Sequence, residues 1–175
     1  MARPETPEST DSTETDLRPP PGRVYSVVLA TAAIVVALDQ ITKSLALENL
    51  RDGPVDLIKG AVTFDLSFNS GGVFGLLQGF PGIFLFATIA VVLAILVWVR
   101  NLEESRWLVP LGMILGGGLG NLSDRLFRDL GGQVVDFIDL HVWPVFNLAD
   151  SSIVVGVVLI LLFGVRSRAA APSSE

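Results

Sequence analysis

The sequence predicts an all-α polytopic membrane protein with four transmembrane helices and a small extracytoplasmic β-structure. Half of its 175 residues are hydrophobic and only 17% are charged, which is too apolar for an ordinary soluble domain. Four apolar stretches each approach the roughly 20 residues that a helix needs to cross about 30 Å of hydrocarbon. Between the first two stretches, apolar and polar residues alternate, which predicts strands.

Composition also defines the two ends of the chain. Residues 1–22 are rich in Pro, Ser and Thr and have few large apolar side chains, so we expect a disordered cytoplasmic tail. Much of the net charge of −6 lies there, and no basic region indicates nucleic acid. Residues 23–168 form the expected membrane domain, and residues 169–175 form a short C-terminal tail. The chain has no cysteine, which excludes disulfides and thiolate chemistry.

The first predicted span, from Val24 to Leu47, is interrupted by polar residues in its second half. Asp39 and Lys43 are four residues apart, so they lie on one helical face and can pair there. A charged side chain at bilayer depth costs at least about 2.5 kcal/mol, so such residues are functional candidates. An ion pair that only anchors the helix is the alternative.

Residues 48–77 are less apolar, and their short alternating runs predict strands or a hairpin at the membrane surface. Asn69, Ser70, Gly71 and Gly72 mark a turn at which the backbone could approach a ligand closely. A plain tight turn is equally compatible with these residue types.

The second span, from Phe80 to Val99, contains no charge. The third begins at Trp107, an aromatic residue suited to the membrane interface, and carries several glycines between positions 116 and 120 that permit close packing or local unwinding. After them come Asn121, Asp124 and Arg125, whose spacing places all three on one helical face.

The fourth span runs from about Asn147 to Val165, with Asp150 in its first turns. A short apolar piece, Val134 to Phe137, precedes it and contains Asp136. Four spans place both termini on one side of the membrane, and the distribution of Lys and Arg favours the cytoplasm for that side. Six basic residues flank the spans there, against four opposite: Arg18, Arg23, Arg100, Arg106, Arg166 and Arg168, against Arg51, Lys59, Arg125 and Arg128.

The single histidine, His141, limits the chemistry. We expect it to be an interfacial loop residue, because no nucleophile-elbow pattern supports a triad with Ser70 or Ser123. No fixed-spacing motif supports a carboxylate metal site either. Paired carboxylates remain: two aspartates that share a poorly solvated site do not both ionise readily, so one can act as base while the other holds a proton. Asp136 with Asp150 is the favoured pair, and Asp124 with Asp150 is almost equally good on spacing.

Four segments, taken together and in this order, resemble bacterial lipoprotein signal peptidase, also called signal peptidase II. The resemblance covers roughly residues 24–168. The segments are Asp39-Gln40-x-x-Lys43, Asn69-Ser70-Gly71-Gly72-Val73-Phe74-Gly75, Gly117-x-x-Gly120-Asn121-x-x-Asp124-Arg125 with Val134-Val135-Asp136-Phe137, and Phe146-Asn147-x-Ala149-Asp150. Gly72-Val73 stands where small residues such as Ala are common in that family.

The resemblance implies four transmembrane helices with the small β-structure and a partly helical loop. It implies an aspartic endopeptidase of the bacterial inner membrane that cleaves lipoprotein precursors before a diacylglyceryl-modified cysteine, at an active site near the outer face. Asp136 and Asp150 match the catalytic positions, and Asp124 matches a structural aspartate that would pair with Arg125 or a neighbour. The matched positions that bind substrate or support the catalytic pair are Asp39, Lys43, Asn69, Asn121, Arg125 and Asn147.

No cofactor and no metal are expected, and a monomer among membrane lipids, with the lipid-modified precursor as substrate, is the expected working form. A small proton-coupled transporter is the alternative function, because intramembrane polar residues also mark ion pathways. A noncatalytic membrane assembly factor is a third.

Overall fold

The computed structural model describes residues 21–71, 81–99, 102 and 104–169. The expected N-terminal tail lies outside these residues except for its last two, because the first helix already begins at Pro21. Residues 72–80, which join the sheet to the second helix, also lie outside them, so the partly helical loop stays a prediction.

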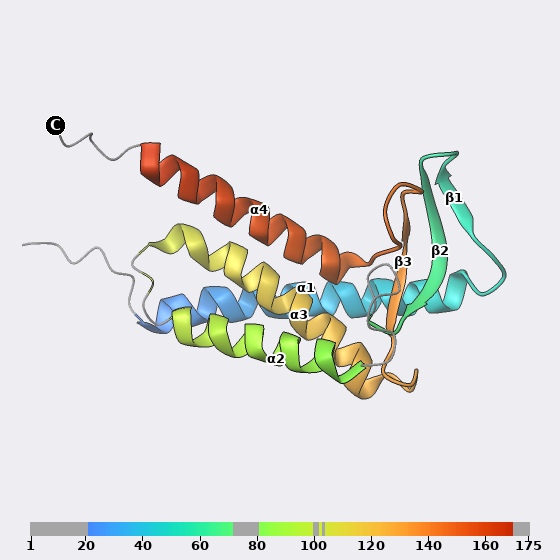
Figure 1. The fold of residues 1–175 in the computed structure, drawn as a ribbon, viewed down its shortest axis with the longest axis horizontal. Coiled ribbons are helices and arrows are strands. Elements are labelled where there is room, and N and C mark those ends of the chain that lie inside the picture. Colours follow the sequence, from blue (N-terminus) through green and yellow to red (C-terminus); the bar gives the residue numbers. More distant parts are fainter. Residues whose placement is uncertain (1–20, 72–80, 100–101, 103, 170–175) are drawn as a thin grey trace, which may run out of the picture.

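Four long helices run side by side, alternately up and down, with a small sheet at one end (Figure 1). A short 3-10 helix, η3 (Ser105–Trp107), leads into α3, which packs against the other three long helices. The four are α1 (Pro21–Asn49), α2 (Pro81–Trp98), α3 (Leu108–Phe127) and α4 (Leu148–Ala169). Each overlaps one of the four apolar stretches in the sequence, and their ends differ from the expected ones by a few residues.

The helices expose apolar side chains and bury polar ones, the reverse of a soluble domain. Ile34 on α1 and Leu161 on α4 are each more than 60% exposed, whereas Asp39, Lys43 and Asp124 are fully buried. Two segments of the described residues are long and apolar enough to cross a membrane, Arg23–Asn49 and Leu148–Val165, and Phe86–Trp98 is a shorter apolar helix. The surface therefore fits a lipid environment.

Glycines on α3 let the neighbouring helices approach closely. A Cβ added at Gly117 would lie 2.4 Å from the carbonyl oxygen of Ala149 on α4, and one added at Gly116 would lie 2.7 Å from Cβ of Val35 on α1. Neither position has room for a side chain, so these backbones pack in direct contact, as small residues allow between membrane helices. The helix is continuous through this region, so the glycines serve packing and not the local unwinding that the sequence also allowed.

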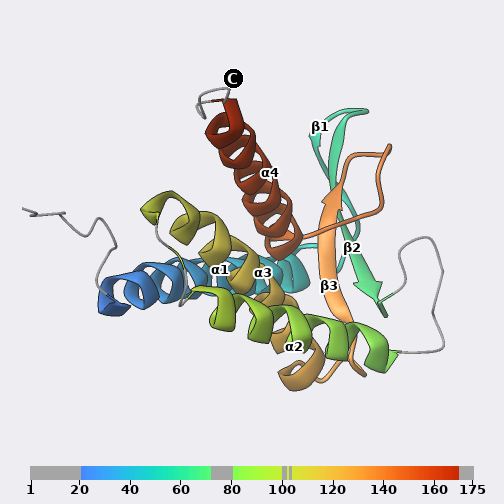
Figure 2. The ribbon, with the colours of Figure 1, turned by 60° about the vertical axis from the view of Figure 1, so that its left-hand side comes forward.

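The sheet contains three antiparallel strands in the order β1 (Val55–Ile58), β2 (Val62–Asn69) and β3 (Val134–Asp139). The hairpin of β1 and β2 was expected from the alternating pattern. The third strand was expected only as a short apolar piece in a loop. It joins β2 with Ser67 opposite Asp136 and Asn69 opposite Val134, and Figure 2 shows it between β2 and the start of α4. The sheet thereby carries Asp136 to the end of the helix bundle.

Gly117→Ala should destabilise the fold by about 1–3 kcal/mol, because the added methyl group has to push the backbone of α4 away from α3. Thermal unfolding in detergent micelles measures the loss. Gly118→Ala is the matched control, since its Cβ would meet Thr88 at an ordinary 3.6 Å, and Ala favours a helix over Gly by about 1 kcal/mol. Equal stability of the two variants would contradict the close packing of α3 and α4.

Candidate active site

The first turn of α4 is closed by reciprocal hydrogen bonds between Asn147 and Asp150. Asn147 Oδ1 accepts the backbone N–H of Asp150 at 2.9 Å, and Asp150 Oδ2 accepts the backbone N–H of Asn147 at 3.3 Å. This is a capping box, in which each side chain satisfies a backbone donor that the helix start leaves free. It fixes the Asp150 carboxylate at the N-terminus of α4, where the helix dipole favours negative charge.

Asn147 also joins Asp150 to Asp136. Its Nδ2 donates to Asp136 Oδ1 at 2.6 Å, while Asn69 Nδ2 donates to Asp136 Oδ2 at 2.9 Å. Asp136 and Asn147 are both at most 1% exposed. The structure thus brings together, through one buried amide, two aspartates that stand fourteen residues apart in the sequence.

Burial raises the pKa of Asp136 to about 6, because the charged form has lost its water. The negative charge of Asp150 raises the pKa as well, whereas the hydrogen bonds from Asn69 and Asn147 lower it. This carboxyl group therefore holds a proton into a pH range in which an exposed aspartate is ionised.

Asn121 on α3 completes the surroundings of Asp150. Its Nδ2 donates to Asp150 Oδ1 at 2.7 Å, and its Oδ1 accepts from Lys43 Nζ at 2.9 Å and from Asn147 Nδ2 at 3.0 Å. Lysine can only donate, so Lys43 fixes which end of the Asn121 amide faces it. The NH2 group of Asn121 is consequently held toward Asp150.

The other two asparagines are oriented in the same way. Asn69 Oδ1 accepts the backbone N–H of Gly71 at 2.8 Å, and Asn147 Oδ1 accepts the backbone N–H of Asp150. Both oxygens are occupied by backbone donors, so both NH2 groups must point at Asp136. Three locked amides therefore supply the donors that surround the two carboxylates.

Lys43, which binds Asn121, also pairs with two further carboxylates. Its Nζ is 2.9 Å from Asp39 Oδ2 and 2.9 Å from Asp124 Oδ2, and all three side chains are fully buried. The pairing of Asp39 with Lys43 along one helical face was expected from their spacing. Asp39 Oδ1 also accepts the backbone N–H of Ala149 at 2.9 Å, so α1 satisfies a donor at the start of α4.

Side chains and a backbone N–H of the protein itself supply the donors that bind Asp124. Beyond Lys43, it accepts from Gln40 Nε2 at 2.9 Å, Arg128 Nε at 3.0 Å and the backbone N–H of Val135 at 3.1 Å. The expectation was that Asp124 pairs with Arg125 or a neighbour, and the cations that pair with it are Lys43 and Arg128. Four donors hold Asp124 between α1, α3 and β3, so it is the weaker partner for Asp150.

Arg125 lies on the same turn of α3 but serves the other side of the cluster. Its Nη1 donates to the backbone carbonyl of Asn121 at 3.2 Å, and Asp150, Asp136 and Asp124 lie within electrostatic range of its guanidinium group. The side chain therefore adds a positive charge near the two aspartates. The contacts of the described residues give it no ion pair.

A small polar cavity of about 200 Å³ opens beside Asp136. One wall is the end of β2, from Ser67 to Ser70, and the opposite wall is Pro144 with Val145, from the segment that connects β3 to α4. Asp136 is thus the carboxylate that borders an open space large enough to admit part of a ligand.

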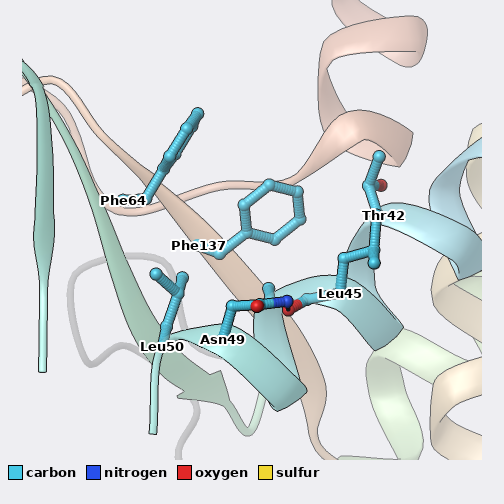
Figure 3. A pocket seen from close by; sticks show the side chains of 7 residues that line it. Thr42, Leu45, Asn49, Leu50, Phe64 and Phe137 are labelled. Atoms are coloured by element: carbon cyan, nitrogen blue, oxygen red, sulfur yellow. Dashed lines mark hydrogen bonds between the residues drawn. The ribbon is translucent and has the colours of Figure 1, made fainter. Parts of the chain in front are cut away.

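An apolar cavity of about 260 Å³ lies near the sheet as well, but apart from the polar cluster (Figure 3). Phe64 and Phe137 form one side, with ring centroids 6.2 Å apart, and the last turns of α1, including Leu45, form the other with Leu50, which directly follows the helix. Successive side chains of a strand point to opposite faces, so Phe137 and Asp136 face different sides of β3. This cavity does not border the aspartates.

Within the described residues, no group of three or more His, Asp and Glu side chains is arranged to hold a metal ion, and every buried side-chain nitrogen and oxygen there has a hydrogen-bond partner. The site is therefore a closed network of carboxylates, amides and one ammonium group.

Comparison with known proteins agrees with this arrangement. The family model described as "Signal peptidase (SPase) II" matches residues 31–166. The chain belongs to the signal peptidase II family. Proteins named lipoprotein signal peptidase are similar to it: one from Mycobacterium avium is 43% identical over 162 residues, covering 90% of this chain and 88% of its own length, and one from Rhodococcus jostii is 40% identical, covering 78% and 71%.

Two solved structures described as bacterial membrane enzymes have a similar fold. One has a TM-score of 0.76 and 27% identity and covers 86% of this chain and 94% of its own. The other has a TM-score of 0.68 and 29% identity, covering 81% and 91%. The signal peptidase II family is a protease family, so the chain is a member of a family of membrane proteases.

Sequence reasoning did not assign roles to two residues of the network, Gln40 and Arg128. Arg128 Nη2 lies 3.1 Å from Gln40 Oε1, and both side chains bind Asp124. The spacing of Asp124 and Arg128 at i and i+4 was the available signal, but Arg128 follows the third span and was counted only as a loop cation.

Replacing Lys43 with Met should destabilise this signal peptidase II family member by about 3–5 kcal/mol, because the change leaves Asp39 buried without its cation and removes one of the two cations that pair with Asp124. The measurement is the free energy of unfolding in micelles. Glu104→Gln is the control, since Glu104 pairs with Arg106 at the surface, where an ion pair contributes about 1 kcal/mol at most. A loss below about 1 kcal/mol for Lys43→Met would contradict the role of Lys43 as the buried counter-ion.

Asp136 should make the fold less stable as the pH rises. Its pKa is about 6 in the folded chain against an ordinary value of 3.8, so the folded state binds the proton more tightly and stability falls with increasing pH between these values. Two pKa units correspond to about 3 kcal/mol. We therefore expect the parent to lose stability relative to Asp136→Asn as the pH rises from 4 to 8. The loss in the free energy of unfolding should reach up to about 3 kcal/mol. A pH-independent difference would exclude the raised pKa.

Proposed function

We propose that the chain is an intramembrane aspartic endopeptidase that removes the signal peptide from diacylglyceryl-modified lipoprotein precursors. The observation that carries this proposal is that Asn147 binds both carboxyl groups: its side-chain NH2 group donates to Asp136, and its backbone N–H donates to Asp150. Two carboxyl groups in one buried network, one of them with a pKa raised to about 6, have the protonation states that acid–base hydrolysis of a peptide bond requires.

The proposed reaction uses one water molecule between the two carboxyl groups. Ionised Asp150 accepts a proton from the water as its oxygen attacks the scissile carbonyl carbon, and protonated Asp136 donates its proton to the carbonyl oxygen. The tetrahedral intermediate then breaks at the C–N bond, and the proton on Asp150 passes to the leaving amine of the cysteine. One hydroxyl group of the intermediate returns its proton to Asp136 as the carboxyl group of the product forms, which restores both aspartates. Asp136 is assigned as the acid because its pKa is the raised one.

The remaining residues have supporting roles in this proposal. Asn69, Asn121 and Asn147 hold the carboxylates with their NH2 groups, and Lys43 with Asp39 holds Asn121 and the start of α4. Arg125 supplies positive charge beside the pair and binds carbonyl groups of the substrate backbone, which would otherwise lose water without compensation. Asp124 supports the fold only.

In the proposed arrangement all four long helices cross the bacterial inner membrane, with both termini in the cytoplasm and the sheet at the outer face. A diacylglyceryl anchor then holds the scissile bond near the outer interface, at the depth of the start of α4. Restriction to one plane and one depth supplies much of the orientation that the reaction needs. A monomer suffices, because one chain contributes all of the proposed groups.

A proton-coupled transporter receives less support from the arrangement. The buried ionisable side chains of the described residues, Asp39, Lys43, Asp124 and Asp136, form a contiguous network with the start of α4. A conduction path would need such groups at successive depths of the membrane.

Asp136→Asn and Asp150→Asn should each lower kcat/KM for a diacylglyceryl-modified precursor peptide by about 10²- to 10⁴-fold, since each removes one partner of the proton transfers. The assay measures cleavage before the lipidated cysteine by purified protein in micelles, with thermal unfolding measured in parallel. Asp52→Asn, in an exposed turn, is the matched control and should cleave like the parent.

Two outcomes would contradict the proposal. If a well-folded Asp136→Asn cleaves normally while a well-folded Asp124→Asn does not, the peptidase function stands but the assigned pair is wrong. If the folded parent cleaves no lipid-modified precursor, the peptidase function fails and proton transport or membrane assembly becomes the better interpretation.

A further inference from the structure

A second side-chain network crosses the sheet away from the two aspartates. Asp56 on β1, Thr63 on β2 and Asp139 on β3 stand opposite one another in adjacent strands. Thr63 is buried, and its hydroxyl donates to Asp56 Oδ1 at 2.9 Å. The three residues form a row across the sheet, several residues along β2 from Asn69.

His141 closes over this row. Its Nε2 lies 3.0 Å from Thr63 Oγ1, its Nδ1 lies 3.2 Å from Asp139 Oδ2, and its backbone N–H donates to Asp139 Oδ1 at 2.6 Å. Its backbone has φ of 59°, a left-handed conformation that non-glycine residues adopt rarely, although His is among those that tolerate it. Contacts to both ring nitrogens hold the residue in that turn.

The hydrogen bonds of this network also define the protonation of the ring. The one hydroxyl hydrogen of Thr63 goes to Asp56, because a carboxylate can only accept. His141 Nε2 must then donate to Thr63, while Nδ1 donates to the carboxylate of Asp139. All contacts are made together only when both ring nitrogens carry a hydrogen. Asp56 and Asp139 are the charged groups that the described contacts bring to this network.

Residues 140–146 lead from the end of β3 toward the start of α4, and we call them the connecting strap. The turn at His141 lies at the beginning of this strap. Its far end is fixed by Phe146, whose backbone pairs with Phe137 and Ile138 of β3 and which directly precedes Asn147. Between the two fixed ends, Pro144 and Val145 form one wall of the cavity beside Asp136. The position of that wall therefore depends on the anchor at His141.

We propose that His141 is a positioning residue: with Thr63 and Asp139 it fixes the connecting strap, and thereby the wall of the cavity in which the substrate lies beside Asp136. The proposal rests on the proposed peptidase function. The ring touches neither aspartate of the pair, so its effect is on substrate binding and not on the proton transfers.

Steady-state cleavage of a diacylglyceryl-modified precursor peptide tests this role. His141→Gly keeps the left-handed turn but removes the ring, and Thr63→Val removes the hydroxyl without changing the shape of the side chain. Each should raise KM by about 3- to 10-fold at pH 5.5 with kcat within about 2-fold, the pattern of lost binding that is equal in ground and transition states.

Thr63→Ser is the matched control, because it keeps the hydroxyl and should restore KM to within about 2-fold of the parent. An unchanged KM in His141→Gly and Thr63→Val would overturn the proposal. So would an equal change in Thr63→Ser, since that result would indicate a merely structural site.

A second measurement does not depend on cleavage. His141 is the only histidine in the chain, so its imidazole gives a single set of NMR signals. In the folded parent at pH 5.5, both ring N–H signals should be observed and should exchange slowly with water, and the Nε2–H signal should be lost in Thr63→Val but kept in Thr63→Ser. If the parent cleaves nothing while these signals behave as expected, the peptidase function fails and the anchor remains; fast exchange in the parent overturns the anchor itself.

Discussion

A buried lysine with two carboxylates is the interaction on which the rest of the site depends. Removing three charges from water is expensive, and only good geometry with further hydrogen bonds offsets that penalty. The protein meets this condition by recruiting partners from different elements: Ala149 N–H of α4 binds Asp39, Val135 N–H of β3 binds Asp124, and the Asn121 amide binds Lys43. Satisfying the charges therefore fixes α1, α3, α4 and β3 relative to one another.

The same network also fixes the orientation of the asparagine amides that bind the two aspartates. An asparagine amide has two ends of nearly equal size but opposite character, so its orientation depends on what occupies its oxygen. Lys43 occupies the oxygen of Asn121, and backbone N–H groups occupy those of Asn69 and Asn147. The donors around Asp136 and Asp150 are thus set before any ligand arrives, which is the form of preorganisation that electrostatic catalysis requires.

The sequence predicted the helices and the residues of the network better than it predicted their connections. Apolar length located α1 to α4 because a bilayer imposes that length, and spacing placed Asp39 beside Lys43 because helical geometry is local. The contact of Asp124 with Lys43 depends on how α1 packs against α3, so sequence spacing alone could not reveal it, whereas the i, i+4 spacing of Asp124 and Arg128 could have indicated theirs. In the same way, Val134 to Asp139 is too short to be distinguished from a loop until β2 pairs with it. The preference for Asp136 over Asp124 came from resemblance to a family, and spacing alone left the two nearly equal.

The capping box at the start of α4 constrains how this region can vary. Asp150 is held at the third residue of the helix by the same bonds that begin the helix, so its direction is set by where the first turn starts. Each residue advances an α-helix by about 100°, and an insertion between Asn147 and Asp150 would therefore turn the carboxylate to a different side of α4. An insertion near Val142 and Trp143, which are exposed in the connecting strap, would leave that register intact. Length variation among relatives of this chain is accordingly expected at the tip of the strap and not within the four residues that follow Phe146.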